Sequence, residues 1–376
     1  MDIKSLFISG TIIVLGIIWM GLFNVPDTLG NPYQENDLDL KENPIEESNQ
    51  LSLVMVGDAL IHGSLYKEAK RINDQYDFAY IFEHFKDYFH QYDLAFYNQE
   101  SIIGGKELGF SAYPRFNTPK EFADLMVEMG FNLVSLANNH SFDKGEKGLL
   151  NSNKYWKDQP VLAAGTYSSV EERGMPRVKM MNNISYSLLS YTVPTNGLSA
   201  PKGKEYLVNV FNYDLVAKDI EKVRDKVDLL IVSMHWGVEY VNYPNLEQKK
   251  IAEFLASKGV DIVIGHHPHV LQPIEIIDGT LIFYSLGNFV SAQNTNDRLT
   301  GMIASLNIKK ENNRLNFSDL EVRLIYTYHR NFKNFKLYPY EKLNYQLFFD
   351  YENFYLKYKN ILTSLNNEVF VFSLDG

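Results

Sequence analysis

The chain of 376 residues contains no cysteine. This absence excludes disulfide bonds, a lipid-modified cysteine anchor and thiolate metal ligands, so any metal site must be built from His, Asn, Asp and Glu. Charged residues are also scarce, at 22%, and the net charge is −10. Because phosphate contacts require a basic surface, this charge argues against general nucleic-acid binding. Hydrophobic residues make up 45%, enough for one large core or two modest ones.

A long uncharged run lies near the amino terminus. Residues 5–23 are dominated by Ile, Leu, Phe, Val and Gly, and a helix of that length can cross a bilayer. We therefore predict a transmembrane anchor over residues 5–23, preceded by a cytoplasmic terminus of residues 1–4. A cleaved signal peptide is the alternative, but no small-residue cleavage pattern follows Phe23. Residues 24–50 are rich in Asn, Asp, Glu and Pro and are predicted to be an acidic linker.

The charges on either side of this run predict the orientation. Lys4 precedes it, whereas mostly acidic residues follow it. Basic residues tend to stay on the cytoplasmic side, so the bulk of the chain is predicted to be exported. The absence of cysteine fits an extracellular protein that uses no disulfides. The predicted localisation is the cell membrane, with a single span and the main domain outside the cell.

Strand-length apolar runs recur from residue 51 onward. Two helical patterns, over residues 119–129 and 245–257, each have a glycine just past their end. This alternation of strands and helices predicts an α/β domain over residues 51–330. A hairpin of residues 302–308 and 315–328 is predicted near its end. The other strands are predicted over residues 51–56, 94–97, 133–136, 161–164, 186–190, 229–233, 262–264 and 281–284.

The last part of the chain, residues 331–376, is predicted to be an aromatic helical extension. Residues 341–365 place Leu, Phe, Tyr and Ile at spacings of three and four, which indicates one helix with a wide apolar face. Packing on the main domain is favoured. Contact with a partner or a membrane is the alternative.

Polar residues gather where the predicted strands end, and six of the nine histidines are among or near them. Taken alone, each of these polar residues is typical of an ordinary turn or helix cap. Their repetition at successive strand ends instead favours one shared site, because parallel strands place such ends at one edge of a sheet. The residues are Asp58 and Glu100 after the first two strands, Asn139, His140 and Asp143 after the third, His235 after residues 229–233, and His267 and His269 after residues 262–264.

The donor types in this group point to a divalent transition metal. The candidate ligands combine carboxylates, an amide and imidazoles, which suit Mn, Zn or Fe rather than Ca. Six ligands exceed one tetrahedral site and suffice for two ions, so one or two ions are predicted. The candidate ligands are Asp58, Glu100, Asn139, His235, His267 and His269.

The order of these motifs resembles the CapA family of poly-γ-glutamate capsule proteins. The matching segments run from residue 51 to 308 and are VGDALIHG, NQES, FNTPKEF, GFNLVSLANNHSFDKG, HWGVEY, VDIVIGHHPHVLQPIE and YSLGNFV. The family is similar to the calcineurin-like metallophosphatases. The resemblance implies a four-layer αββα sandwich, in which two sheets lie between helices.

The resemblance also implies roles for individual residues. His140 matches the catalytic histidine, with Asp143 as a second catalytic candidate, and Glu100 lies in the region of the bridging metal carboxylate. The remaining metal ligands match Asp58, Asn139, His235, His267 and His269.

Three positions depart from the metallophosphatase pattern. Leu60 stands where a ligand histidine is expected, Asn98 and Glu100 replace a bridging Asp, and Ser141 follows His140 where an acid is common. His62 is a candidate replacement for the missing ligand.

The resemblance implies a function in poly-γ-glutamate capsule synthesis or export. We expect a membrane-anchored extracellular protein that works with membrane-embedded synthetase subunits and acts on the polymer through a metal-bound water. Such an activity would be that of a metal-dependent hydrolase or transferase. Two alternatives stay open: a surface metallophosphatase or phosphodiesterase, and a noncatalytic scaffold that binds the polymer.

Overall fold

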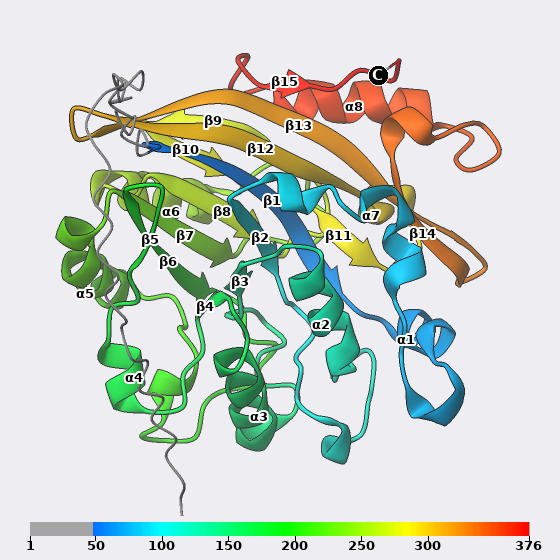
Figure 1. Ribbon diagram of the computed structural model, residues 1–376, viewed down its shortest axis with the longest axis horizontal. Coiled ribbons are helices and arrows are strands. Elements are labelled where there is room, and N and C mark those ends of the chain that lie inside the picture. Colours follow the sequence, from blue (N-terminus) through cyan, green and yellow to red (C-terminus); the bar gives the residue numbers. More distant parts are fainter. Residues whose placement is uncertain (1–47, 376) are drawn as a thin grey trace, which may run out of the picture. The chain divides into compact units, whose positions relative to one another are not determined.

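Two β-sheets pack face to face in the computed structural model, which describes residues 48–375 (Figure 1). The predicted terminus, anchor and linker lie outside the described residues, apart from residues 48–50. The first sheet has the order β14 (Lys333–Pro339), β13 (Arg314–Arg330), β12 (Thr300–Glu311), β1 (Gln50–Leu60), β2 (Leu94–Asn98), β3 (Leu133–Ser135) and β4 (Leu162–Ala164), with β11 (Asn288–Ser291) paired to β1 and β15 (Phe370–Val371) paired to β13.

The second sheet is smaller. Its order is β5 (Lys179–Met181), β6 (Ile184–Thr192), β7 (Leu229–His235), β8 (Ile262–His266), β10 (Thr280–Phe283) and β9 (Ile274–Ile277). In each sheet the central strands run parallel, β1 to β4 in the first and β6, β7, β8 and β10 in the second. Every strand predicted from the sequence overlaps one of these strands, and the predicted hairpin is β12 and β13.

Helices cover the outer face of each sheet. Apolar side chains of α1 (Gly63–Ala69), α2 (Lys120–Glu128) and α3 (Gly145–Lys157) pack on the first sheet. Those of α5 (Tyr213–Val223) and α6 (Leu246–Ser257) pack on the second. A third core fills the space between the sheets. The α/β sandwich of four layers expected from the resemblance is therefore present.

The two predicted helices end close to where the sequence placed them. The first is α2 and the second is α6, which begins at a capping box formed by Asn245 and Gln248. Gly130 and Gly259 follow them with φ angles of 103° and 76°, a left-handed conformation that glycine adopts without strain.

Short helices complete the described chain. Three are α-helical: α4 (Val170–Gly174), α7 (Asn296–Leu299) and α8 (Tyr351–Leu362). Seven are 3-10 turns: η1 (Ile72–Asp74), η2 (Ala79–Phe85), η3 (Phe89–Gln91), η4 (Lys106–Leu108), η5 (Glu205–Leu207), η6 (Arg224–Lys226) and η7 (Tyr340–Lys342). None of the helices within residues 48–375 has the length and apolar character needed to cross a bilayer.

The helix predicted over residues 341–365 is shorter than expected and corresponds to α8. The side chain of Asn344 accepts the backbone N–H groups of Gln346 and Leu347, so these donors are taken up by a local turn instead of a helix. The helix lies beside β12 and β13, and Tyr358 and Leu362 are fully buried in the core that also fills the space between the sheets (Figure 1). Packing on the main domain, the favoured prediction, is confirmed for this face.

Candidate metal centre

The two sheets bring the predicted ligands together at the carboxyl ends of their parallel strands. Asp58 lies near the end of β1, Glu100 two residues after β2, and His235 at the last position of β7. These three side chains are fully buried. His267 and His269 follow β8, Asn139 follows β3, and each of these is at most 7% exposed. All six predicted metal ligands therefore meet in one buried cluster.

The donors form two groups, which we call the first and the second donor group. In the first, His235 Nε2 lies 3.1 Å from His267 Nδ1, 3.0 Å from Asn139 Oδ1 and 3.7 Å from Glu100 Oε1.

In the second donor group, His269 Nδ1 lies 3.4 Å from Asp58 Oδ2, and His269 Nε2 lies 3.6 Å from Glu100 Oε1. Carboxylate and imidazole atoms in each group lie within 4.8 Å of one another. Glu100 belongs to both groups, which is the geometry of a bridging ligand.

The unpaired polar atoms of this cluster fit a cation. Both carboxylate oxygens of Glu100 are buried without a hydrogen-bond partner among the described residues. Burying an unpaired carboxylate is costly, and a bound cation removes that cost. The mix of imidazole, amide and carboxylate donors, without sulfur, suits a divalent transition metal such as Mn, Zn or Fe.

Burial and neighbouring charges shift the pKa values of the donors. Burial raises the pKa of Glu100 well above its ordinary value. Burial also lowers the pKa of His235, and it lowers that of His267 to about 4. Both imidazoles are therefore neutral near pH 7, as metal ligation requires.

Two donors of the second group are shifted toward their charged forms. Burial opposes the charge on His269, but the carboxylates of Glu100 and Asp58 outweigh it and raise the pKa of His269 to about 9. Burial likewise opposes the charge on Asp58, yet the adjacent imidazoles of His266 and His269, 3.3 and 3.4 Å from its oxygens, hold its pKa well below the ordinary value. A metal that binds this group must displace the proton of His269.

Buried polar side chains outside the two groups fix the orientation of the ligands. Asn98 Nδ2 donates to Asp58 Oδ1 at 2.7 Å, so the amide that replaces a bridging Asp acts behind the ligand shell. Asn288 Oδ1 lies 2.9 Å from His269 Nδ1. Such partners fix the ring orientation and the basicity of ligands.

The backbone around Pro268 turns both flanking imidazoles inward. His267 and His269 have φ angles of 96° and 57°, in the left-handed region that side chains other than glycine rarely adopt. The N–H of His267 donates to Asp58 Oδ2 at 3.2 Å and ties this turn to β1. The ring centroids of His267 and His269 lie 6.1 Å apart, and strained backbone of this kind is typical of functional sites.

His140 and Asp143 form a hydrogen-bonded pair beside the donor groups. The Nδ1 atom of His140 lies 2.7 Å from Asp143 Oδ2, which also accepts the backbone N–H of Phe116 at 2.6 Å. This contact leaves His140 Nε2 as the ring atom available for proton exchange. A histidine oriented by a carboxylate is the arrangement used in general acid–base catalysis.

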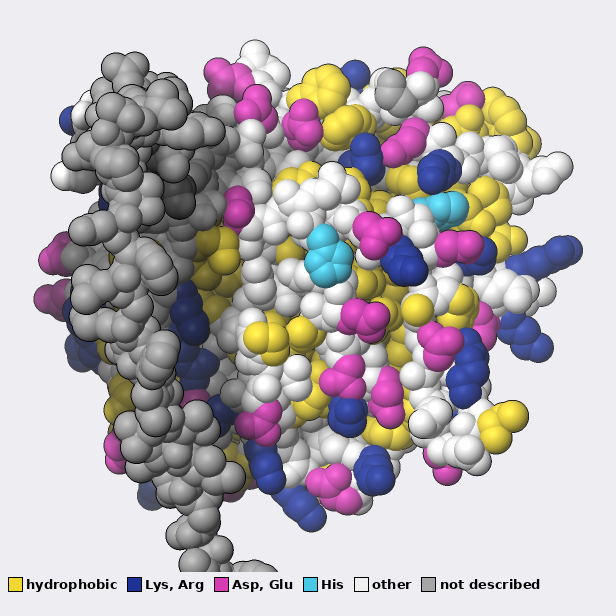
Figure 2. Space-filling model, in the orientation of Figure 1, with side chains coloured by type: hydrophobic (Ala, Val, Ile, Leu, Met, Phe, Trp, Pro, Cys, Tyr) yellow, Lys and Arg dark blue, Asp and Glu magenta, His cyan; other side chains and the backbone are white. Residues whose placement is uncertain are grey.

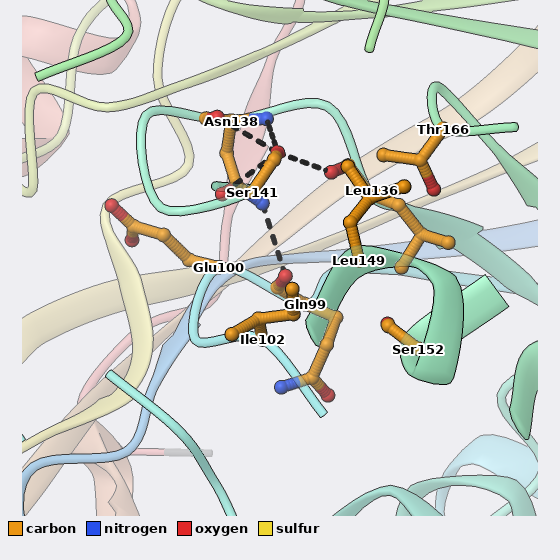
Figure 3. A pocket seen from close by; sticks show the side chains of 9 residues that line it. All are labelled: Gln99, Glu100, Ile102, Leu136, Asn138, Ser141, Leu149, Ser152 and Thr166. Atoms are coloured by element: carbon orange, nitrogen blue, oxygen red, sulfur yellow. Dashed lines mark hydrogen bonds between the residues drawn. The ribbon is translucent and has the colours of Figure 1, made fainter. Parts of the chain in front are cut away.

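Ser141, which stands where an acid is common, fastens the turn that carries Asn139 and His140. Its Oγ lies 2.7 Å from the carbonyl oxygen of Leu136 and accepts the N–H of Asn138 at 2.9 Å (Figure 3). The side chain of Glu100 extends away from Ser141 in this view. The substitution is therefore structural and leaves the donor groups intact.

His62 does not replace the missing ligand at Leu60. It is absent from both donor groups, its Nδ1 lies 3.0 Å from the carbonyl oxygen of Leu60, and its ring packs edge-on against Phe116. Burial lowers its pKa to about 4. The second donor group therefore has three protein donors, Asp58, Glu100 and His269, whereas the first has four.

A pocket of about 460 Å³ opens over this cluster, and it contains residues that the sequence did not single out. Arg115, Asn196 and Tyr240 line it together with His140 and His269. These three residues reach the pocket from loops, and loops have no hydrophobic periodicity from which their position could be predicted. Two further residues lie next to the donor groups: Asn288, the first residue of β11, and His266, whose ring stacks on Phe96.

The four-layer sandwich and the donor groups at its strand ends define an α/β protein with a candidate divalent-metal centre. Residues 52–293 match the family model for the bacterial capsule synthesis protein PGA_cap. The chain belongs to this family. The CapA resemblance noted from the motifs is thereby confirmed.

Two curated relatives extend this match. The chain is 28% identical over 264 residues to the PGA biosynthesis protein CapA of Bacillus subtilis strain 168, covering 69% of this chain and 68% of that one. It is 30% identical over 262 residues to the capsule biosynthesis protein CapA of Bacillus anthracis, covering 66% of this chain and 61% of that one.

Two solved structures are more distant. One is described as a novel phosphatase from Mycoplasma pneumoniae, with 14% identity, a TM-score of 0.46, and coverage of 80% of this chain and 99% of that one. The other is the calcineurin-like phosphoesterase YfkN of Bacillus subtilis, with 14% identity, a TM-score of 0.43, and coverage of 74% and 90%.

Proposed function

We propose that this protein acts on poly-γ-glutamate during capsule synthesis or export, through a centre of two divalent metal ions. The observation that carries the proposal is the pair of donor groups that share Glu100, together with the polar pocket that Asn139 of the first group and His269 of the second group line. Membership of the capsule synthesis family and the names of the two CapA relatives supply the pathway.

The first donor group would hold one ion through Asn139, His235, His267 and Glu100, and the second would hold the other through Asp58, His269 and Glu100. Divalent ions at such positions polarise a carbonyl or phosphoryl oxygen and activate water as a nucleophile.

The protein itself contributes orientation and proton transfer. Asp143 holds His140 in one ring orientation, so that its Nε2 can give a proton to the group that leaves the cleaved or transferred γ-glutamyl bond. The polar walls of the pocket bind the substrate beside this proton donor.

We also propose that residues 5–23 anchor the protein in the cell membrane, with the described residues outside the cell and the poly-γ-glutamate synthetase subunits as partners. The uncharged run and the acidic sequence after it support this orientation. Protease added to intact cells should degrade the domain of residues 48–375 if the orientation is correct. Protection until the membrane is opened would contradict it.

Metal content and polymer output together test the proposal. Purified full-length protein should contain close to two transition-metal ions per chain, and His267→Ala should lose metal and reduce the polymer that cells produce by at least about 10-fold, as loss of a metal ligand does. His90→Ala, at an exposed histidine outside the pocket, is the matched control and should change neither. A His267→Ala variant that lacks metal and keeps full polymer output would overturn the proposal and favour a noncatalytic scaffold.

A phosphodiesterase is the second candidate function. Two ions on a shared carboxylate, next to a histidine that can protonate a leaving group, also fit phosphoryl transfer. Turnover of a phosphodiester reporter by the wild type, lost in Asp58→Ala while polymer output stays normal, would favour this candidate.

A further inference from the structure

Arg115 lies in the wall of the pocket above the donor groups. It is exposed, and it lines the same cavity as His140 and His269. The cavity holds about 460 Å³, room for a short stretch of an extended chain.

The backbone of Arg115 is fixed on both sides. Its N–H donates to the carbonyl oxygen of Ala112 at 3.1 Å, and its own carbonyl oxygen accepts the hydroxyl of Ser111 at 2.6 Å. The next residue, Phe116, is fully buried, with its N–H on Asp143 and its ring against His140. The guanidinium is thus carried by a segment that is tied to the proposed proton donor.

The guanidinium of Arg115 has no acid or carbonyl partner within residues 48–375. Three less exposed arginines of the described chain differ, because Arg173, Arg224 and Arg323 each pair with a carboxylate. A guanidinium presents a planar fork of donors that matches a carboxylate or a phosphate. An unpaired one in a pocket wall is therefore a recognition group for an anion.

The charge around the pocket favours an anion only when the centre holds cations. Asp143 and Glu239 in its wall, and Asp58 and Glu100 in the buried donor groups, repel an anionic ligand, and bound divalent ions would reverse that potential. On the face drawn in Figure 2, acidic and basic side chains of the described residues are interspersed, so that face offers a polyanion no broad basic field.

We propose that Arg115 binds the α-carboxylate of the γ-glutamyl residue whose amide bond lies at the donor groups. The inference rests on the proposed function and adds the group that selects the substrate. A chain linked through side-chain carboxyls keeps one α-carboxylate beside every amide bond. Arg115 can therefore grip this carboxylate while the adjacent amide faces His140 and the donor groups.

Binding of a short γ-linked glutamate oligomer to the metal-loaded full chain tests this assignment by calorimetry. Arg115→Ala should weaken binding by about 10-fold or more, and Arg115→Lys by less, because lysine keeps the charge and loses the two-pronged contact. Arg314→Ala removes an exposed arginine at the start of β13, outside the pocket, and it should bind as the wild type does. Metal content and melting temperature should be unchanged in all three variants.

A second oligomer, with its α-carboxylates converted to neutral amides, isolates the contact. It should bind weakly to the wild type and no more weakly to Arg115→Ala, because the group that Arg115 grips is missing. Equal loss for both oligomers would show that Arg115 acts in another way and would overturn the assignment.

The remaining outcomes separate the inference from the proposed function. If Arg115→Ala binds the γ-linked oligomer as tightly as the wild type, the role of Arg115 fails and the proposed function stands. If Arg115→Ala loses affinity for inorganic phosphate alone, the anion is a phosphate and the carboxylate assignment fails. If the metal-loaded wild type does not bind the oligomer, the proposed substrate and the inference fail together.

Discussion

Glu100 is the residue on which the candidate metal centre depends most. It lies in both donor groups, and its two carboxylate oxygens have no hydrogen-bond partner among the described residues. An aspartate at the end of the strand would be shorter by one methylene. Glu100 lies two residues past the end of β2, where an aspartate would be too short. The longer glutamate side chain lets its carboxylate reach both groups from this position.

Replacing Glu100 by Gln should separate metal binding from folding. The Glu100→Gln variant keeps the shape and removes a buried carboxylate that accepts no hydrogen bond among the described residues, so the metal-free protein should still fold. Metal affinity should fall by more than about 100-fold, because a ligand of both ions is lost. Titration against a competing chelator measures the affinity, and thermal melting of the metal-free forms measures stability.

Glu239→Gln is the matched control for this experiment. Glu239 also lines the pocket but belongs to neither donor group, so its variant should bind metal as the wild type does. Equal losses in the two variants would show that pocket charge, and not ligation by Glu100, governs metal binding.

His269 should make metal affinity depend on pH. Its pKa of about 9 means that it carries a proton below that pH in the metal-free protein, and a metal must displace this proton. Affinity should therefore rise by about 10-fold per pH unit between pH 6.5 and 8.5, one proton being released per binding event. Calorimetry in buffers with different ionisation enthalpies counts the protons, and a release of none would contradict the role of His269.

The convergence of the candidate ligands could be predicted from the sequence, and the residues that position and surround them could not. Asp58, His235 and His267 follow apolar strands, and parallel strands must bring such positions to one edge. Asn288 and Arg115 reach the site through turns whose direction depends on the finished fold. Nothing in the local sequence distinguishes Asn288 from an ordinary turn residue, nor Arg115 from a solvated surface arginine.

At the scale of elements, α8 closes the core where the second sheet does not reach. Its buried face packs with side chains of β12 and β13, and its opposite face carries exposed residues such as Leu356. The sequence showed the apolar periodicity of this segment but placed the start of the helix ten residues too early. Periodicity records which face is apolar, whereas the turn that Asn344 closes keeps residues 344–347 out of the helix.

Two leucines of α8 provide a matched pair of variants. Leu362 is fully buried and Leu356 is 55% exposed. Leu362→Ala should lower the free energy of unfolding by about 2 to 5 kcal/mol through lost burial and a cavity. Leu356→Ala should change it by less than about 0.5 kcal/mol. Denaturant titrations measure both, and a large effect in Leu356→Ala would show that the exposed face is also covered in solution.

At the scale of the whole molecule, the candidate metal centre joins the two sheets. Asp58 and Glu100 come from the first sheet, and His235, His267 and His269 come from the second. Alternating apolar runs were enough to predict an α/β protein. The division of these strands between two sheets required the family resemblance, because strands buried on both faces look alike in sequence.

Removing the metal should therefore loosen the packing of one sheet on the other. Ions that bind only the folded state stabilise it by mass action, so chelation should lower the melting temperature of the wild type by at least about 5 °C. The Glu100→Gln variant should show no such drop, because it starts without the ions. Equal melting temperatures for the metal-loaded and metal-free wild type would contradict a structural contribution from the centre.

The pairing of β12 with β1 matters for any truncation of this protein to the segment that matches the family model. The family match stops at residue 293, yet residues 300–339 supply three strands of the first sheet, including the neighbour that covers one side of β1. In a fragment that ends at residue 293, the side of β1 that pairs with β12 would become an exposed edge. Its backbone N–H and C=O groups would be unpaired, and such an edge promotes aggregation. The minimal folding unit thus extends well past the segment by which the family is recognised.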